Sequence, residues 1–355
     1  MSAEVAFRAD AARDMGSGHV VRCVSLADEL RRRGVRTRFI ARYLPPALEA
    51  GVLRRGHAVV RLPVPAVPDP DLTGYARWLG VRTDTDAIET AGALDASGGA
   101  EWLVYDHYAL DARWSRIARE HSKRVLAIDD LADRAHECDV LLDQTPCSDP
   151  AARYRHLVPA GCRQLLGPRF ALIRGEFLAA RAAARIRNDG IHSILVALGA
   201  FAEEAHLATI LGGLGRLVKP DGIRVNVIGE TRPPTAQYGF ELIFHGFVEH
   251  PAQLLLTSDL AIGGAGTSAW ERCCLALPSV VLVIADNQRL TAEGLANSGC
   301  AINLGSLSSV QANAVSEVVG NLIREPARVA QMSSRASGLV DGLGAGRVAD
   351  EMGII

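Results

Sequence analysis

Short runs of apolar and β-branched residues alternate with amphipathic, Ala- and Leu-rich segments along the whole chain. This alternation is typical of repeated βα units, whose parallel strands form a sheet with helices on both faces. It predicts an α/β fold made of Rossmann-like, doubly wound sheets. The expected strands are 4–8, 36–40, 57–60, 102–105, 124–128 and 139–142 in the first half, and 193–197, 223–228, 241–244, 259–262, 279–284 and 301–303 in the second.

The chain has 355 residues, which exceeds the size at which a single hydrophobic core usually stops growing. An Ala/Arg-rich helical segment over 178–190 ends in the turn residues Arg187-Asn188-Asp189-Gly190, and a new strand follows. We therefore predict two Rossmann-like domains, over 1–185 and 186–355. Because doubly wound sheets bind ligands beyond the carboxyl ends of their strands, we expect the ligand in an interdomain cleft.

Charge, hydropathy and cysteine content narrow the function classes. The formal net charge of -2 gives no electrostatic basis for binding nucleic acid. No stretch approaches the ~20 apolar residues of a membrane span, and the amino terminus lacks the features of a signal peptide. The chain has seven cysteines, an odd number, and no two of them are spaced as C-x-x-C. Both observations argue against a disulfide framework or a zinc site. We expect a cytoplasmic protein without metal or cofactor, either a monomer or a weak dimer.

The first expected strand leads through Arg8 and Asp10 into the turn Gly16-Ser17-Gly18-His19, which opens a helix. Glycines let a ligand approach the backbone, and the N–H groups of a first helical turn favour an anion. Val21 replaces the third glycine of G-x-G-x-x-G, which disfavours a dinucleotide site of the usual kind. The helix dipole disfavours a charged imidazole at His19, so a neutral ring could accept a proton. The alternative is a polar first-turn residue without catalytic function.

A second glycine-rich turn, Gly263-Gly264-Ala265-Gly266-Thr267-Ser268, follows the strand expected over 259–262. Three glycines and two hydroxyls at a helix start suit a diphosphate. Glu271, one turn into the helix, could accept both hydroxyls of a ribose. Alternatively, Ser268 and Glu271 form a capping box that satisfies the helix end.

Other strand ends carry weaker signals. Asp106-His107-Tyr108 follows one strand, although Asp106 could cap the next turn while Tyr108 packs. Asp129-Asp130 could hold a metal, but loop capping is favoured. Asp84-Thr85-Asp86 is similar to the D-x-D of metal-dependent glycosyltransferases, but an N-cap function is favoured. Asp286-Asn287-Gln288 follows the strand 279–284 and is also expected to face the ligand.

Several long motifs, in order along most of the chain, resemble the UDP-2,4-diacetamido-2,4,6-trideoxy-β-L-altropyranose hydrolase family of pseudaminic acid biosynthesis. In the first half these are F-R-A-D-A-A-R-D-M-G-S-G-H-V-V-R-C-V-S-L-A, V-Y-D-H-Y-A-L-D and I-D-D-L-A-D-R-A-H-E-C-D-V-L-L-D-Q. L-L-G-P-R-F-A-L-I-R-G-E-F, W-E-R-C-C-L-A-L-P-S and A-D-N-Q follow them.

The resemblance implies a GT-B-like fold, shared with the lipid-linked N-acetylglucosaminyltransferase of peptidoglycan synthesis. It also implies metal-free, inverting hydrolysis of a UDP-sugar in a pathway that serves flagellin glycosylation. His19 matches the family's catalytic histidine, which activates water, and Tyr108 and Asn287 match polar residues near the sugar and the water. The residues expected to bind the substrate are Arg8, Asp10, Gly16, Gly18, Asp106, Gly199, Gly264, Gly266, Thr267, Ser268, Glu271 and Gln288.

One departure leaves other functions open. The family usually begins its second domain with a strand ending in G-G-S-D or G-G-T-D, whereas this chain has Gly199-Ala200-Phe201. The alternatives are a glycosyltransferase of the same fold and a non-catalytic nucleotide-sugar-binding protein. A transferase with a lipid-linked acceptor would usually show an apolar or basic membrane-facing patch on its first domain. The candidate for such a patch is the basic run Arg31-Arg32-Arg33 with Arg36 and Arg38. A solvated helix end is the favoured interpretation of this run.

Overall fold

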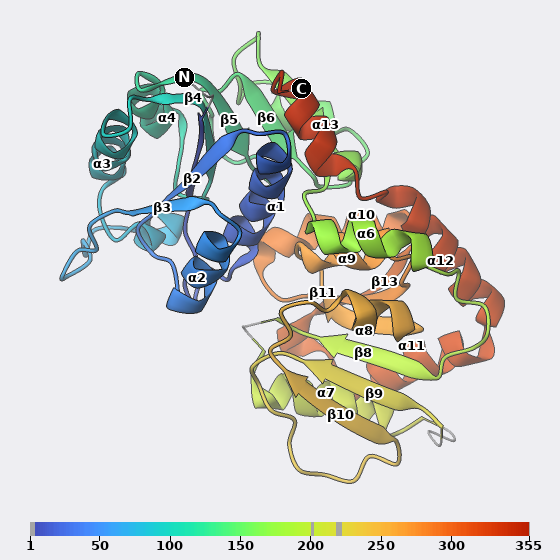
Figure 1. Cartoon of the computed structure of the whole chain (residues 1–355). Coiled ribbons are helices and arrows are strands. Elements are labelled where there is room, and N and C mark those ends of the chain that lie inside the picture. The colour runs from blue at the N-terminus through green and yellow to red at the C-terminus, as the bar shows by residue number, and fades with distance from the viewer. Residues whose placement is uncertain (1–3, 200–201, 218–221, 355) are drawn as a thin grey trace. The chain divides into compact units, whose positions relative to one another are not determined.

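The computed structural model describes residues 4–199, 202–217 and 222–354, which form two compact units (Figure 1). Unit 1 combines Met1–Leu172 with Gly344–Ile355, and unit 2 comprises Ile173–Leu343. Each unit is built around one parallel sheet covered by helices.

Unit 1 contains a seven-stranded parallel sheet in the order β3-β2-β1-β4-β5-β6-β7. Its strands are β1 (Glu4–Ala9), β2 (Arg36–Ala41), β3 (Ala58–Arg61), β4 (Ala100–Asp106), β5 (Ser122–Ile128), β6 (Val140–Asp143) and β7 (Arg163–Leu166). Its helices are α1 (Gly18–Arg32), α2 (Pro46–Arg54), α3 (Thr83–Asp95), α4 (Ala112–Arg119), α5 (Pro150–Tyr154) and α13 (Gly344–Glu351), with 3-10 turns η1 (Gly74–Trp78) and η2 (Pro168–Phe170).

The inner strand β1 shows why this sheet is covered on both faces. Val5, Phe7 and Ala9 are buried in one hydrophobic core, and Ala6 is buried in the other. The first core is closed by α1, whose residues Val20, Cys23 and Leu30 are buried in it, and by α13, which lies beside α1 in Figure 1.

Unit 2 contains a six-stranded parallel sheet in the order β10-β9-β8-β11-β12-β13. Its strands are β8 (Ser193–Ala197), β9 (Arg224–Ile228), β10 (Glu241–Gly246), β11 (Leu260–Gly264), β12 (Ser279–Val283) and β13 (Ala301–Ser306). Its helices are α6 (Gly175–Ala180), α7 (Glu204–Leu214), α8 (Ala252–Thr257), α9 (Ser268–Cys274), α10 (Arg289–Asn297), α11 (Ala312–Arg324) and α12 (Pro326–Leu339), with 3-10 turns η3 (Arg181–Ala183), η4 (Asp286–Gln288) and η5 (Leu307–Ser309).

Each expected strand corresponds to an observed one, which confirms the two doubly wound sheets. The prediction omitted β7, a four-residue edge strand that contains no β-branched residue. None of the helices in the described ranges has the combined length and apolar character that a membrane span requires.

The observed division of the chain differs from the predicted one at both ends of unit 2. The boundary lies between Leu172 and Ile173, rather than between residues 185 and 186. Arg181 donates hydrogen bonds to the carbonyls of Cys274 and Val340, so the arginine-rich segment is fastened to unit 2. The carboxyl-terminal residues 344–355 belong to unit 1, because Val348 and Ala349 of α13 complete its core.

Candidate functional site

His19 and Asp106 meet at the carboxyl edge of the first sheet. His19 is the second residue of α1, Asp106 is the last residue of β4, and Nδ1 of His19 lies 2.7 Å from Oδ1 of Asp106. An ionised carboxylate only accepts hydrogen bonds, so Nδ1–H donates and Nε2 of a neutral ring is left to accept a proton. The side chain of His19 is 6% exposed and that of Asp106 is fully buried. This is the geometry of a general base oriented by a carboxylate.

Arg22 fixes the carboxylate behind His19. Its Nε and one terminal nitrogen donate to the two oxygens of Asp106, at 2.5 and 2.7 Å, and its other terminal nitrogen donates to Asp130 at 2.9 Å. Burial alone would favour the neutral acid, but Arg22 and His19 hold the pKa of Asp106 well below its usual range. Arg22 was absent from the predicted site. Arg22 follows His19 by three residues and therefore lies on the same face of α1, which is the sequence signal that could have identified it.

Tyr108 packs edge-to-face against the ring of His19. The two ring centroids are 4.6 Å apart and the rings are nearly perpendicular, at 85°. Burial and the charge of Asp130 raise the pKa of Tyr108 well above its ordinary value, so its hydroxyl remains protonated. Tyr108 can therefore donate a hydrogen bond but does not act as the base at neutral pH.

His107 is the other histidine at this strand end. Burial, only partly offset by the charge of Asp10, lowers the pKa of His107 to about 3. Its Nδ1 accepts a hydrogen bond from the backbone N–H of Ala109 at 3.1 Å, which occupies the lone pair that a base would need. Of these two histidines, His19 is therefore the one whose geometry leaves a ring nitrogen available to accept a proton.

Arg8 and Asp10, which were predicted to bind the substrate, are fully buried. Arg8 donates to Asp10 at 2.9 Å and to Asp86 at 2.7 Å, and Arg42 donates to Asp86 at 2.7 Å. Oδ1 of Asp10 accepts the backbone N–H of Arg42 at 2.7 Å. These contacts tie β1, the end of β2 and α3 together. They do not support direct contact between Arg8 or Asp10 and a substrate.

The same network corrects the interpretation of Asp84-Thr85-Asp86. The N-cap of α3 is Arg82 and it makes no capping hydrogen bond through its side chain. Asp86 lies inside the first turn, where its carboxylate also accepts a hydrogen bond from the indole of Trp114 at 2.9 Å. It is a buried counter-ion for two arginines, a function that the local pattern did not reveal.

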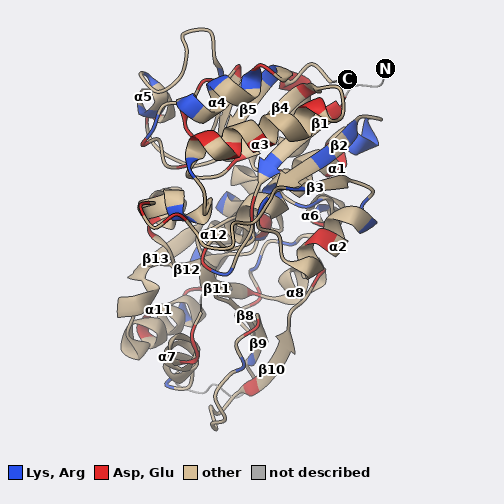
Figure 2. Cartoon of the chain, turned by 90° about the vertical axis from the view of Figure 1, so that its left-hand side faces the viewer, with Lys and Arg blue, Asp and Glu red and all other residues tan. Residues whose placement is uncertain are grey.

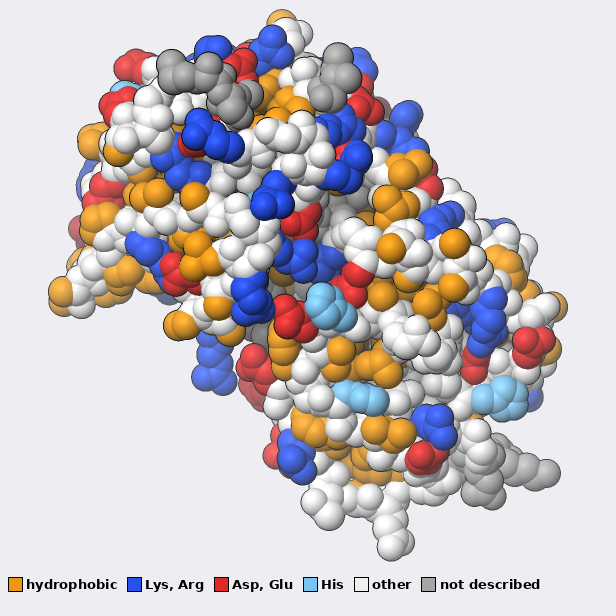
Figure 3. All heavy atoms as spheres, viewed as in Figure 1, with side chains coloured by type: hydrophobic (Ala, Val, Ile, Leu, Met, Phe, Trp, Pro, Cys, Tyr) orange, Lys and Arg blue, Asp and Glu red, His pale blue; other side chains and the backbone are white. Residues whose placement is uncertain are grey.

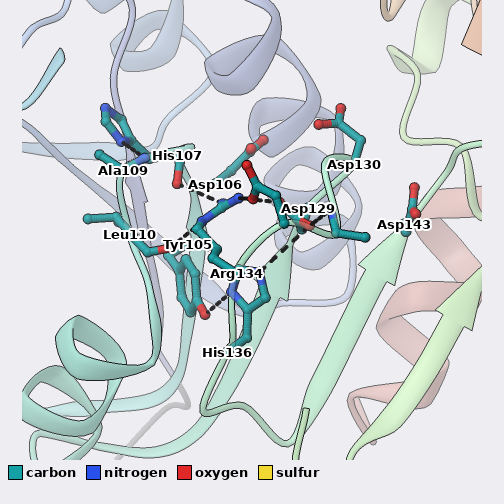
Figure 4. A network of polar contacts seen from close by, with 12 residues as sticks. Tyr105, Asp106, His107, Ala109, Leu110, Asp129, Asp130, Arg134, His136 and Asp143 are labelled. Atoms are coloured by element: carbon teal, nitrogen blue, oxygen red, sulfur yellow. Dashed lines mark hydrogen bonds and ion pairs between the residues drawn. The ribbon is translucent and has the colours of Figure 1, made fainter. Parts of the chain in front are cut away.

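Asp129 directly follows β5 and anchors the loop around it (Figure 4). Its Oδ2 accepts the backbone N–H of Ala132 at 2.8 Å, and its Oδ1 pairs with Arg134 at 2.9 Å. Arg134 also donates to the carbonyls of Leu110, at 2.8 Å, and His107, at 3.3 Å. Asp129 therefore caps a loop, and Arg134 connects that loop to the segment carrying Tyr108. Within the described residues, no group of three or more His, Cys, Asp or Glu could hold a metal ion.

The glycine turn before α1 has the backbone that its sequence suggested. Gly16 has a φ of 75°, in the left-handed region that favours glycine, and its N–H bonds to the carbonyl of Ala12 at 2.8 Å. Gly18 is the first residue of α1, and the preceding Ser17 makes no side-chain capping bond. Anion binding by this turn remains a prediction.

In unit 2, the turn after β11 is tightly packed from behind. A Cβ atom on Gly264 would lie 2.6 Å from the side chain of Ile284, and one on Gly266 would lie 3.2 Å from Nε2 of Gln288. Oε1 of Gln288 accepts the backbone N–H groups of Ala265, at 3.2 Å, and Ile284, at 3.3 Å. Gln288, predicted to bind the substrate, is seen here to hold the turn in shape.

The capping-box alternative for Ser268 and Glu271 is contradicted. Thr267 is the N-cap of α9 without a side-chain cap, and Oγ of Ser268 accepts a hydrogen bond from Arg272 at 3.1 Å. Oε1 of Glu271 instead accepts a hydrogen bond from Nε of Arg174 at 2.9 Å. Burial raises the pKa of Glu271 and the charge of Arg174 opposes this rise. Glu271 is 5% exposed, and its pairing with Arg174 fixes the orientation of its side chain. Its carboxylate does not cap the start of α9.

The remaining predicted residues of unit 2 lie at one edge of the sheet. β8, β11 and β12 are neighbours, and Gly199, Thr267 and Asn287 each follow one of these strands. Asn287 is half-buried in η4, and Gly199 is exposed with a φ of 78°. Ala200 and Phe201, which carry the departure from the family pattern, lie outside the described residues.

The basic run of unit 1 is largely neutralised by neighbouring carboxylates. Arg32 and Arg33 pair with Glu29, and Arg36 and Arg38 pair with Glu4. Figure 2 shows Lys and Arg positions of unit 1 interspersed with Asp and Glu positions, and on the face in Figure 3 hydrophobic side chains lie scattered among charged ones. Arg32 is a solvated residue of the helix end, but Arg33 and Arg38 are mostly covered, and Arg36 and Arg38 lie on β2, so the expectation of a solvated helix end holds for only part of the run.

No protein-family model and no curated protein sequence matches this chain. Solved structures do match it over nearly its whole length. MurG of Acinetobacter baumannii has a TM-score of 0.69 at 15% identity, covering 100% of both chains. The kitacinnamycin glycosyltransferase has a TM-score of 0.69 at 17% identity, covering 99% of this chain and 98% of its own. Arabidopsis thaliana UGT89C1, solved with UDP, has a TM-score of 0.66 at 12% identity, covering 99% of this chain and 100% of its own.

The chain has the GT-B fold. This confirms the predicted fold class of two Rossmann-like domains. At such low sequence identity, the likeness shows the fold alone and leaves activity and substrate to be argued from the residues.

Proposed function

We propose that this chain is an enzyme that cleaves the bond between the anomeric carbon of a sugar and the diphosphate of UDP. The observation that carries the proposal is the contact between His19 and Asp106, because it leaves Nε2 of a neutral imidazole as the proton acceptor. In the proposed step, an oxygen nucleophile attacks the anomeric carbon and gives its proton to Nε2. The bond to the diphosphate breaks, and UDP leaves with the electron pair.

The UDP part is assigned to unit 2. Backbone N–H groups at the start of α9 suit a diphosphate, and the close packing behind Gly264 and Gly266 holds them in place. Glu271, oriented by Arg174, is proposed to accept the ribose hydroxyls. The solved complex of UGT89C1 with UDP supports the view that a chain of this fold binds this nucleotide.

Water is the nucleophile that the surroundings of His19 favour. The ring is only 6% exposed and is flanked by Tyr108 and Trp78, whose centroids are 4.6 and 6.1 Å away. The neutralised basic run also gives little support for a lipid-linked acceptor. We therefore infer inverting hydrolysis of a UDP-sugar, and the resemblance of the motifs suggests a 2,4-diacetamido-2,4,6-trideoxy sugar as the substrate.

A glycosyltransferase is the second candidate, and the fold comparisons favour it. The kitacinnamycin enzyme and the calicheamicin enzyme CalG4, both similar to this chain in structure, are glycosyltransferases. In that case an acceptor hydroxyl would replace water at His19, with the rest of the proposed step unchanged.

Incubation of the purified protein with UDP-2,4-diacetamido sugars, without any acceptor, tests both candidates. Hydrolysis predicts equimolar UDP and free sugar, with the inverted anomer detected by NMR before it mutarotates. UDP release that requires an added acceptor would establish the transferase instead. Tight UDP-sugar binding without release under either condition would contradict an enzyme and favour a binding protein. The His19→Asn variant is the control for contaminating activity.

A further inference from the structure

Two cysteines of unit 1 lie with their sulfur atoms close together. The Sγ atoms of Cys138 and Cys162 are 3.6 Å apart, and both thiols are free. Cys138 comes shortly before β6 and Cys162 directly before β7, and these two strands are parallel neighbours. Both cysteines therefore lie at the amino edge of the first sheet, the edge opposite to the one that carries His19 and Asp106. The proposed reaction uses neither thiol.

The backbone holds the two segments at the spacing of paired strands. Val140 pairs with Arg163, and the N–H of Arg163 donates to the carbonyl of Asp139 at 2.8 Å. A disulfide has a sulfur–sulfur distance of about 2.05 Å, so the two Sγ atoms, now 3.6 Å apart, need to approach by about 1.5 Å. Rotation of the half-buried Cys162 side chain can supply a movement of this size.

The two thiols differ in their access to solvent. Cys138 is 2% exposed, whereas Cys162 is half-buried. The hydrogen bond from the thiol of Cys138 lowers the pKa of Cys162, and the same contact together with burial raises the pKa of Cys138. The thiolate is the form of cysteine that acts as a nucleophile. Cys162 is therefore the thiol that a dissolved oxidant meets first, and Cys138 is placed to react with it second.

We propose that Cys138 and Cys162 form a modification site, a dithiol that a hydroperoxide oxidises to a reversible disulfide. The thiolate of Cys162 attacks one oxygen of hydrogen peroxide, the O–O bond breaks, and hydroxide leaves and takes up the proton that Cys162 released. The sulfur of Cys138 then attacks the sulfenic acid formed at Cys162. The S–O bond breaks, and the hydroxyl group leaves as water with the proton of Cys138. Two thiols and one peroxide thus give one disulfide and two water molecules.

The disulfide would tie an edge strand to its neighbour. β7 has four residues and lies at the end of the sheet order, beside β6. Cys138 and Cys162 are 24 residues apart, so their bond closes a loop and restricts the unfolded chain. For a unit of this size we expect oxidation to raise the melting temperature by roughly 5 °C or more. This proposal is independent of the proposed function, because it requires no nucleotide or sugar.

The test treats the whole protein, reduced and then freed of reductant, with hydrogen peroxide. Remaining thiols are blocked with N-ethylmaleimide before the chain is unfolded, and peptides digested without reductant are identified by mass spectrometry. We expect one crosslinked pair that joins Cys138 to Cys162, two hydrogen atoms lighter than the separate peptides and absent after dithiothreitol. The melting temperature should rise on oxidation and return on reduction.

Variants and a second reagent complete the test. Cys147→Ser is the matched control, because Cys147 is also half-buried in unit 1, and it should keep the crosslink. Cys138→Ser should stop at the sulfenic acid of Cys162, which dimedone traps, and should show no rise in melting temperature. Phenylarsine oxide, which bonds two adjacent thiols at once, tests the unaltered chain and should protect both cysteines from N-ethylmaleimide. The absence of a Cys138–Cys162 crosslink in the oxidised wild type, or labelling of both thiols despite phenylarsine oxide, would overturn the proposal.

Discussion

The carboxyl edges of the two sheets differ in what they are made of. In unit 1, the edge is a set of buried charged side chains that bind one another, with Asp106 shared by His19 and Arg22. In unit 2, the corresponding edge is mainly backbone, a glycine turn held from behind by Gln288, with Glu271 and Arg174 as its oriented ion pair.

This difference matches the two tasks proposed for the units, proton transfer in unit 1 and nucleotide binding in unit 2. A general base must be held at one orientation and in one tautomer, which takes several fixed side-chain partners. A diphosphate spreads its charge over many oxygens, for which a row of backbone N–H groups is sufficient. We therefore expect changes in unit 1 to alter turnover and changes in unit 2 to alter nucleotide affinity.

The His19→Asn variant should show the largest effect. Loss of a general base typically lowers turnover by at least ~10²-fold, and the UDP affinity should remain within about threefold because the nucleotide is assigned to unit 2. Steady-state kinetics and calorimetric titration with UDP measure the two quantities. Near-normal turnover in this variant would remove His19 from the mechanism.

The Asp106→Asn variant should have the next largest effect. The amide introduced at this position could either accept the hydrogen of Nδ1 or donate to Nδ1, so it would no longer fix the tautomer of His19, and we expect at least a ~10-fold loss of turnover. Asp130→Asn is the matched control, because Asp130 pairs with Arg22 at 2.9 Å, whereas the carboxylate that contacts His19 is that of Asp106. If both variants lost turnover equally while keeping their melting temperatures, orientation of His19 by Asp106 would be disproved.

Glu271→Gln should produce the opposite pattern in unit 2. Replacing a charged hydrogen-bond acceptor typically costs about 1.5–3 kcal/mol, so the Kd for UDP should rise roughly tenfold or more. Turnover at saturating UDP-sugar should change much less. A loss of thermal stability with unchanged UDP affinity would mean that Glu271 only supports α9.

The fold was predictable because its signal is local and repeated. Each βα unit of a doubly wound sheet needs an apolar strand and an amphipathic helix, and both are visible in short windows of sequence. His19 and the turn around Gly264 were found in the same way, because a strand-to-helix turn is contiguous in sequence.

The ion pairs and hydrogen bonds between these side chains could not be predicted because the paired residues are distant in sequence. Arg22 and Asp106 are 84 residues apart, Arg8 and Asp86 are 78 apart, and Arg174 and Glu271 are 97 apart. A local pattern can show that a charged residue is present but cannot show which opposite charge it meets. Arg8 and Asp10 were assigned to the substrate for this reason, since a charged residue at a strand end looks the same whether it faces a ligand or an unseen counter-ion.

The smallest expected effect concerns the pH dependence of stability. It arises from Asp143, a buried carboxyl group of unit 1, whose counterpart in unit 2 is Glu271. Burial raises the pKa of Asp143, at the end of β6, to about 6, despite its pairing with Arg153. Burial also raises the pKa of Glu271 in unit 2. An acid whose pKa is raised by folding stabilises the protein below its unfolded pKa and loses this contribution as the pH rises through its folded pKa. For Asp143 the loss falls between about pH 4 and pH 6 and amounts to about 3 kcal/mol.

The Asp143→Asn variant removes this titration. Its melting temperature relative to the wild type should therefore increase by at least ~2 °C between pH 4 and pH 7, measured by scanning calorimetry. The exposed Asp286→Asn variant is the control, because an acid that is 91% exposed should give a nearly constant difference over this range. A constant difference for Asp143→Asn as well would show that the charge of Arg153 outweighs burial, and that the carboxyl edge of unit 1 keeps this acid ionised like Asp106.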